Sequence, residues 1–244
     1  MQKLELYWID PQLPADHFPD LQYALDDPNG LLAFGGDLSV ERLIAAYERG
    51  IFPWYSKDEP ILWWSPDPRS VIFPEKFKPS RSLKKTIKKR HFKVTLDTCF
   101  ADVVQKCSQP RSYSSDTWIT DEMMEAYKRL HDLKIAHSVE VWKDDELVGG
   151  LYGVSLGKAF FGESMFSTAS DASKVALAYL VEQVKLWGFK LIDCQVTSDH
   201  MSSLGAVDIP RDLFMNMLSS ECSGKTRMNG WSFDHDITEI ILKR

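Results

Sequence analysis

The sequence predicts an α+β protein in which a small N-terminal part precedes a larger part with a mixed, mainly antiparallel sheet flanked by helices. Three strand-like runs separated by short turns occupy residues 138–163 and are typical of an antiparallel meander. An amphipathic helix over 172–187 and a short apolar strand over 191–195 follow them. A crossover helix leads back into the same sheet, so we expect the last strand beside the meander.

The chain divides by composition into two expected domains, residues 1–65 and residues 66–244. The first is rich in Pro, Gly and aromatic residues, and prolines at its end exclude regular structure. Within it, Ser39 is a candidate N-cap for a helix over 40–49, and Gly50 stands where a helix commonly ends.

Longer elements fill the start of the second part. A basic helix is expected over 80–90, with Ser82 as a possible N-cap, and a strand over 92–96. Two further helices are predicted from apolar residues at helical spacing: Phe100, Val103, Val104 and Cys107, then Met123, Tyr127 and Leu130 after Thr120.

Composition bounds the class of protein. The 244 residues are 44% hydrophobic and 26% charged, as in a globular protein. No apolar run reaches the ~20 residues of a membrane span, and the first residues lack the features of a secretory signal. We therefore expect a cytoplasmic protein without a membrane partner. The cysteines are far apart and predict neither a metal site nor a disulfide framework: Cys99, Cys107, Cys194 and Cys222.

Local charge contradicts the formal net charge of -6. Residues 76–93 contain no acidic residue, and in the basic helix Leu83 and Ile87 form one apolar stripe with cations over the remaining face. This surface is either a site for a polyanion or a solvated face near an acidic one. The cations are Lys76, Lys78, Arg81, Lys84, Lys85, Lys88, Lys89, Arg90 and Lys93.

Polar side chains gather near the end of the predicted sheet. Asp193 and Gln195 are two apart in a strand and so share a face, where they could orient a group-transfer substrate or form the wet face of an edge strand. Glu163 ends the third meander strand just before a helix, where it suits a ligand site or supplies charge to the first helical turn. The neighbouring Phe160 and Met165 would wall an apolar pocket or belong to the core.

The stretch IFPWYSKDEPILWWSPDPRSV concentrates three tryptophans and a tyrosine beside a proline-rich turn. Aromatic side chains bury large areas, so they would form either a hydrophobic plug under a loop or a platform for a flat ligand.

Several long motifs in order make the sequence similar to the bacterial leucyl/phenylalanyl-tRNA protein transferases. The resemblance extends over about residues 28–214. It rests on NGLLAFGGDLSVERLIAAYERGIFPWY, PILWWSPDPR, GGLYGV, FGESMFS, ASK and LIDCQVTSDHMSSLGAVDIPR.

This resemblance implies a reaction and a fold. Members move Leu or Phe from its tRNA to the N-terminal amine of a protein that begins with Arg or Lys, which marks that protein for degradation. Met is a third candidate amino acid. Their larger domain has an acetyltransferase-like (GNAT) fold. No Gly-rich pyrophosphate loop is evident before the helix that begins at Ala172, and acyl supply by tRNA would make coenzyme A unnecessary, so no cofactor is expected.

The resemblance also assigns roles to residues. It implies that Trp54 stacks on the terminal adenosine of the tRNA, that Asp193 polarises Gln195, and that Gln195 accepts a hydrogen bond from the attacking amine. Glu163 would contact a substrate cation, either the aminoacyl ammonium or the basic N-terminal residue of the acceptor. The pocket for the aminoacyl side chain would be lined by Leu151, Phe160, Leu177 and Met165. Further candidates for lining the same cleft are Tyr47, Trp118 and Tyr127. The acceptor stem would lie along the basic helix.

Two other functions stay open from the residues alone. A small-molecule N-acetyltransferase would use the same fold but needs a phosphate loop for coenzyme A. A non-catalytic RNA-binding module would explain the basic helix and Trp54, but not three polar side chains brought to one cleft.

Overall fold

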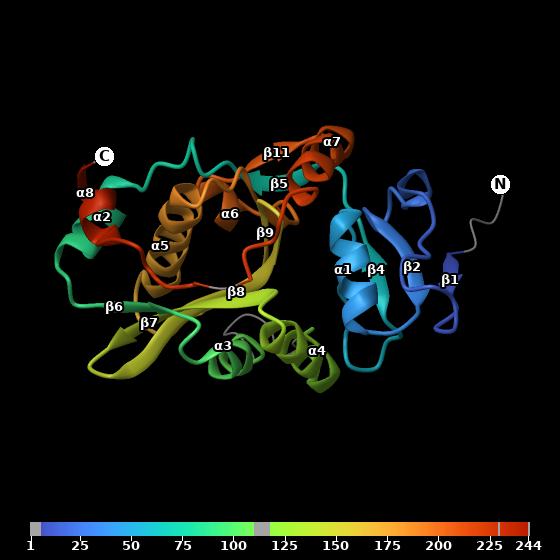
Figure 1. The fold of residues 1–244 in the computed structure, drawn as a ribbon, viewed down its shortest axis with the longest axis horizontal. Helices are drawn as coiled ribbons and strands as arrows, with labels where there is room; N and C mark the ends of the chain where they lie inside the picture. Colours follow the sequence, from blue (N-terminus) through green and yellow to red (C-terminus); the bar gives the residue numbers. More distant parts are fainter. Residues whose placement is uncertain (1–5, 110–117, 229, 244) are drawn as a thin grey trace.

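A computed structural model describes residues 6–109, 118–228 and 230–243, and these residues form two sheets (Figure 1). The small sheet has the strand order β1-β2-β4-β3. Its strands are β1 (Tyr7–Ile9), β2 (Leu31–Gly35), β3 (Phe52–Pro53) and β4 (Leu62–Trp64), with a short 3-10 helix at Leu21–Tyr23.

Helix α1 (Val40–Glu48) accompanies the small sheet and was predicted with its caps. The Ser39 side chain accepts a hydrogen bond from the backbone N–H of Arg42, which satisfies one of the free donors of the first turn. Gly50 has a φ of +68°, a left-handed conformation that glycine adopts without the steric cost of a Cβ. The chain can therefore leave the helix directly into β3.

The large sheet has the order β11-β5-β10-β9-β8-β7-β6. All its neighbouring pairs are antiparallel except β9 and β10, which are parallel. This confirms the predicted meander and the predicted place of the last strand beside it. Its strands are β5 (Arg69–Ile72), β6 (Lys93–Leu96), β7 (Ala136–Lys143), β8 (Glu146–Leu156), β9 (Ala159–Ser167), β10 (Leu191–Gln195) and β11 (Val207–Ile209).

Helices cover both faces of the large sheet (Figure 1). One face packs against α5, with α2 and α8 next to it, and the other packs against α3 and α4. The fold is therefore a mixed sheet flanked by helices, as predicted. The helices are α2 (Arg81–Lys88), α3 (Phe100–Cys107), α4 (Asp121–Asp132), α5 (Ala172–Leu186), α6 (Asp199–Ser203), α7 (Arg211–Cys222) and α8 (Ile237–Lys243). In the part of the chain described, none has the length and apolar character needed to cross a bilayer.

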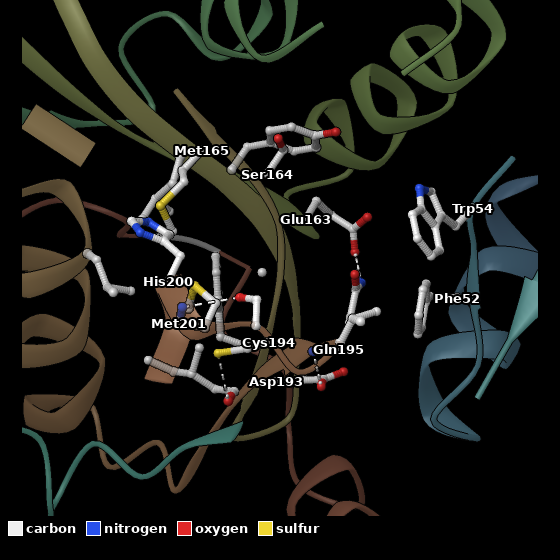
Figure 2. Close-up of a pocket in the computed structure, with 18 of the residues that line it drawn as sticks. Phe52, Trp54, Glu163, Ser164, Met165, Asp193, Cys194, Gln195, His200 and Met201 are labelled. Carbon is white, nitrogen blue, oxygen red and sulfur yellow. Dashed lines mark hydrogen bonds between the residues drawn. The ribbon is translucent and has the colours of Figure 1, made fainter. Parts of the chain in front are cut away.

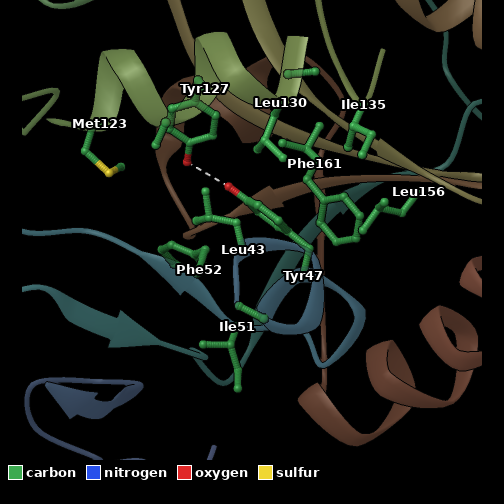
Figure 3. Packing of buried hydrophobic residues seen from close by; sticks show 14 of the residues in the cluster. Leu43, Tyr47, Ile51, Phe52, Met123, Tyr127, Leu130, Ile135, Leu156 and Phe161 are labelled. Carbon is green, nitrogen blue, oxygen red and sulfur yellow. Dashed lines mark hydrogen bonds between the residues drawn. The ribbon is translucent and has the colours of Figure 1, made fainter. Parts of the chain in front are cut away.

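One hydrophobic cluster joins the two sheets. Leu43 and Tyr47 of α1 pack toward Met123 and Tyr127 of α4 (Figure 3), and the rings of Tyr47 and Phe161 lie 5.0 Å apart. Because this core is shared, the division into domains at residue 65 stays a prediction.

The basic helix has a different N-cap from the one expected. Its N-cap is Ser80, whose hydroxyl accepts a hydrogen bond from the N–H of Leu83, and the predicted cap Ser82 lies inside the helix. Both serines can cap a helix. The helix that begins after Ser80 is the one that buries Leu83 and Ile87 against the protein.

Strand β9 is longer than predicted. It continues to Ser167, because Leu151 and Gly150 of β8 pair with Met165 and Phe166. Glu163 therefore lies within a strand rather than at its end, and it does not supply charge to the first turn of α5.

Candidate active site

A cavity of about 450 Å³ lies between the two sheets. One part of its wall is apolar and the other carries Glu163 and Gln195, with Phe52 and Trp54 facing that pair from the small sheet (Figure 2). The apolar part includes Leu151, Phe160, Met165, Leu177, Leu180, Ile192 and Met201. This arrangement suits a ligand with an apolar side chain next to a reacting polar group.

Glu163 reaches the cavity from a β-bulge. In the pairing of β8 with β9, Gly153 lies opposite Gly162 and Tyr152 lies opposite Ser164. Glu163 is consequently an extra residue without an opposite partner, and a bulge of this kind re-aims a side chain. Alternation along the strand could not have predicted its direction.

Three donors enclose the Glu163 carboxylate. Oε1 accepts hydrogen bonds from the Tyr47 hydroxyl at 2.8 Å and from Gln195 Nε2 at 2.8 Å, and Oε2 accepts one from the Tyr127 hydroxyl at 2.6 Å. The two tyrosine oxygens are themselves 2.7 Å apart. Three short oxygen–oxygen contacts therefore join Tyr47, Tyr127 and Glu163, but the two hydroxyl groups supply only two protons for them. A proton on the Glu163 carboxyl would supply the third hydrogen bond.

Burial raises the pKa of Glu163 to about 7, and the negative charge of Asp193 acts in the same direction, against the lowering by the three hydrogen bonds. Burial and the charge of Glu163 also raise the pKa of Tyr47 and Tyr127 well above the ordinary tyrosine value. The tyrosines therefore remain protonated donors near neutral pH, whereas Glu163 can gain or lose a proton there.

Gln195 adopts a left-handed backbone conformation at the end of β10. Its φ is +63°, and the register with β5 shifts between Asp193 and Gln195, which marks a second bulge. A non-glycine residue with such a φ is strained and is held only by its surroundings. Since Nε2 donates to Glu163, the carboxamide oxygen of Gln195 is left to accept a hydrogen bond from a substrate.

Asp193 holds the backbone of this bulge. One of its oxygens accepts a hydrogen bond from the Gln195 backbone N–H at 2.8 Å. Arg69 donates to both oxygens, from Nε at 2.9 Å and from Nη2 at 2.7 Å. Asp193 was expected to polarise Gln195; in the structure it bonds the Gln195 backbone, and the Gln195 carboxamide donates to Glu163 instead.

Arg69 is a site residue that sequence reasoning missed. It is buried with Asp193, donates to the carbonyl of Gly50 at 3.0 Å, and its guanidinium lies over the rings of Phe52 and Phe214. An arginine after a proline-rich turn gave no signal by itself, because its partner lies in a strand more than a hundred residues away.

Trp54 is 41% exposed, so its ring is available at the edge of the cavity. The Trp64 ring supports it at 5.5 Å between centroids, and Trp64 Nε1 donates to the Trp54 carbonyl at 2.6 Å. Trp63, in contrast, is fully buried and donates to the carbonyl of Gly35. Only Trp54 of these three lines the cavity.

Most predicted site residues meet at this cavity. The wall includes Trp54, Trp118, Leu151, Phe160, Glu163, Met165, Leu177, Asp193 and Gln195. Tyr47 and Tyr127 were expected in the wall but stand behind Glu163, which they hold. The cavity also includes His200 and Met201 of α6, which the sequence did not suggest.

The basic helix is not part of the cavity wall. Helix α2 packs against α5 and α8 at the far end of the molecule from the small sheet (Figure 1). Arg90, which follows α2, forms ion pairs with Asp236 and Glu239. These pairs compensate part of the positive charge of the basic segment. The cations of the helix itself are exposed or half-buried at the surface: Arg81, Lys84, Lys85, Lys88 and Lys89.

The raised pKa of Glu163 predicts a pH-dependent stability. The folded protein favours the protonated carboxyl, so the stabilisation is present at low pH and is lost as the pH rises from the ordinary glutamate value through about 7. The free energy of unfolding of the wild type minus that of Glu163→Gln should therefore fall by about 2 to 3 kcal/mol between about pH 5 and about pH 8. Urea unfolding of both proteins measures this difference. The pH-dependent contributions of the other titrating groups are common to the two proteins and cancel when one free energy is subtracted from the other. An equal difference at both pH values would contradict the prediction.

Two family sequence patterns match the chain. The sequence pattern described as "Leucyl/phenylalanyl-tRNA protein transferase" matches residues 71–219, and that of the N-terminal domain of the same protein matches residues 36–67. Among solved structures, a GCN5-related N-acetyltransferase from Kribbella flavida is 11% identical, with a TM-score of 0.35 over 68% of this chain and 59% of its own.

Curated relatives are similar over nearly their whole length. Leucyl/phenylalanyl-tRNA--protein transferase of Cellvibrio japonicus (strain Ueda107) is 59% identical over 86% of this chain and 89% of its own. The protein of that name from Nitrosospira multiformis is 53% identical over 94% of this chain and 99% of its own. By these matches, which include the cavity residues on β8, β9 and β10, the chain belongs to the leucyl/phenylalanyl-tRNA protein transferase family.

Proposed function

We propose that this protein transfers Leu or Phe from aminoacyl-tRNA to the N-terminal amine of an acceptor protein. The observation that carries the proposal is the cavity in which an apolar wall meets the hydrogen-bonded pair of Glu163 and Gln195 beside the exposed ring of Trp54. Family membership supports the same reaction.

The aminoacyl side chain would occupy the apolar part of the cavity. Leu151, Phe160, Met165 and Leu177 offer apolar contacts without a polar group that would need a partner. Methionine side chains adapt to differently shaped ligands, which supports acceptance of both Leu and Phe, and of Met. Apolar pockets discriminate by about 1 to 3 kcal/mol per methylene, so shape rather than hydrogen bonding would select the amino acid.

The 3′-terminal adenosine would stack on Trp54. Base–aromatic stacking contributes about 1 to 3 kcal/mol per base, and Trp64 holds the Trp54 ring in place from behind. This contact would place the ester bond near Gln195, between the adenosine and the apolar pocket.

The chemistry is aminolysis of an ester. The lone pair of the acceptor amine attacks the ester carbonyl, a C–N bond forms, the bond to the ribose oxygen breaks, and a proton passes from nitrogen to that oxygen. The Gln195 carboxamide oxygen would accept a hydrogen bond from the attacking amine and orient its lone pair. A neutral carboxamide is a poor base, so orientation and relay of the proton are its roles.

Glu163 would fix the carboxamide so that its oxygen faces the amine. Because Tyr47, Tyr127 and Gln195 already occupy its oxygens, this holding role has direct geometric support. Its position at the cavity also supports attraction of a substrate cation, either the aminoacyl ammonium or a basic N-terminal residue. We propose acceptors that begin with Arg or Lys, their subsequent degradation, and the cytoplasm as the compartment of the reaction.

The basic helix would bind the acceptor stem of the tRNA through phosphates. Replacing Lys84, Lys85, Lys88 and Lys89 by Ala should weaken tRNA binding and flatten its salt dependence, since each lost phosphate contact lowers the logarithmic slope by about 0.7 to 0.9. Filter binding over a salt series measures this. The control variant removes the same charge at four exposed lysines elsewhere: Lys57, Lys128, Lys143 and Lys225. Equal slopes in the two variants would remove α2 from the tRNA site.

The proposed function is tested by incubating the protein with Phe-tRNA labelled in the amino acid and with a peptide that begins with Arg, beside one that begins with Glu. We expect labelled Arg peptide and unlabelled Glu peptide. Binding of tRNA without transfer by folded protein would favour a non-catalytic RNA-binding protein, and acetylation of an amine from acetyl-coenzyme A would favour an N-acetyltransferase.

A further inference from the structure

The C-terminal tail, which carries no motif that the proposed reaction uses, reaches the back of the cavity wall. Trp231 in this tail is 7% exposed and belongs to the same hydrophobic cluster as Leu151, Phe160 and Leu177, which line the cavity. The tail lies outside the residues matched by the family patterns, which end at 219. A segment beyond the family match thus packs against the wall of the candidate pocket.

Trp231 fills the space between the sheet and the residues after α5. Its ring stacks on His137 of β7, with centroids 3.7 Å apart and planes 7° apart. The rings of Trp187 and Phe189 meet it edge-on at 5.0 Å and 6.3 Å. The ring of Phe160 is 6.0 Å away, within the range of interacting aromatic pairs.

Phe160 is confined on another side by the backbone of β8. A Cβ built on Gly153 would lie 2.6 Å from Phe160 Cε1, so the ring rests directly on this glycine. His137, on which Trp231 stacks, pairs with Gly153 across the sheet. The Phe160 ring is therefore packed between Gly153 and the Trp231 side of the core, and it cannot retreat from the cavity while Trp231 is in place.

Hydrogen bonds fix the tail on both sides of Trp231. Before it, the Trp231 Nε1 donates to the carbonyl of Arg227 at 2.9 Å, and the Arg227 guanidinium lies 4.2 Å from the Trp187 ring centre. After it, Asp234 accepts a hydrogen bond from Gln183 Nε2 at 2.9 Å and donates its backbone N–H to Gln183 Oε1 at 3.1 Å. Both anchors connect the tail to α5 and the residue that follows it.

We propose that Trp231 determines amino-acid specificity by positioning Phe160 and so setting the depth of the aminoacyl pocket. This inference rests on the proposed function, because it takes the apolar cavity as the pocket for Leu and Phe. Trp231 is a positioning residue that does not touch the substrate. Without its ring, Phe160 gains room to move back, and the pocket deepens in favour of the longer side chain.

The test compares kcat/KM for Phe-tRNA with kcat/KM for Leu-tRNA in the wild type, Trp231→Ala and Trp231→Phe. The Phe-to-Leu ratio should rise about fivefold in Trp231→Ala, near the low end of the effect of one methylene of space in an apolar pocket. It should rise only about twofold in Trp231→Phe, because the remaining ring leaves less space. A smaller folded fraction changes both values equally and leaves the ratio unchanged. If Trp231→Ala does not fold, the Phe-to-Leu ratio of Trp231→Phe alone tests the proposal.

The matched control is Phe233→Leu in the same tail. Phe233 packs edge-on against Tyr179 at 5.7 Å and is not part of the cavity wall, so its ratio should equal that of the wild type. A Trp231 variant with an unchanged or lowered ratio, or a ratio shared with Phe233→Leu, overturns the inference. Absence of Phe and Leu transfer by the wild type would instead overturn the proposed function.

Discussion

Replacing Gln195 by Ala is expected to lower kcat for transfer from Phe-tRNA by about 100-fold to 1000-fold, the range found when a positioned hydrogen-bonding group is removed from a reacting centre. The variant loses the carboxamide oxygen that would orient the amine and leaves Glu163 without the donor at 2.8 Å. Single-turnover transfer to an Arg peptide measures the chemical step separately from tRNA release.

Two comparisons make this result specific. The Kd for tRNA should stay close to that of the wild type, because the phosphate contacts proposed for α2 do not involve Gln195. Gln105→Ala, an exposed glutamine of α3, should transfer at the wild-type rate. A Gln195→Ala protein with more than about a tenth of the wild-type kcat would contradict the assigned role.

The largest expected effect on stability is that of Arg69→Met. The change removes the donors to both oxygens of Asp193 and leaves a carboxylate buried without its cation. Removing one partner of a buried ion pair costs about 3 to 5 kcal/mol. The free energy of unfolding in urea should fall by this amount, and transfer should fall as well, because Asp193 holds the backbone of Gln195.

The double variant Arg69→Met with Asp193→Asn tests the reason for this loss. Removing the unpaired charge at position 193 should recover part of the stability. Activity should not return with it, because the new amide lacks the two Arg69 donors that fix the bulge before Gln195. The matched control is Arg49→Met, since Arg49 and Asp16 form an exposed pair at 3.6 Å and such pairs contribute about 0 to 1 kcal/mol. Equal losses in Arg69→Met and Arg49→Met would contradict the account of the buried pair.

Periodicity predicted those elements whose signal is local. The meander, α5 and β10 were predicted because alternation with period 2 and apolar spacing of 3.6 are written within each segment. Strands β5 and β11 were not, because each is short and its pairing partners lie far along the chain. A strand after two prolines is indistinguishable from a turn until its neighbours are known.

The sequence predicted which residues form the candidate site, but it did not predict the hydrogen bonds among them. Asp193 and Gln195 were expected on one face of a strand, yet the bulge between them gives them different partners. The bulge at Glu163 likewise aims its side chain where alternation does not apply. Bulges depend on the partner strand, and the cation that neutralises Asp193 comes from a third strand, so these contacts exist only in the assembled sheet.

The resemblance supplied what periodicity could not. It singled out Trp54 among several neighbouring aromatic residues, and Trp54 lines the cavity. It also grouped Tyr47 and Tyr127 with the cleft, whereas the structure gives them the task of holding Glu163. The tail beyond residue 219 carries no motif of the family, and only the packing of the folded chain brings Trp231 close to Phe160.

The most direct measurement is the mass of an Arg-initiated peptide after incubation with the protein and Phe-tRNA, with fragmentation to locate the addition. The account predicts a gain of one phenylalanyl residue joined by an amide bond to the α-amine, with deacylated tRNA as the other product. An unchanged peptide together with hydrolysed Phe-tRNA would contradict it, because the cavity would then activate the ester for water rather than for an amine.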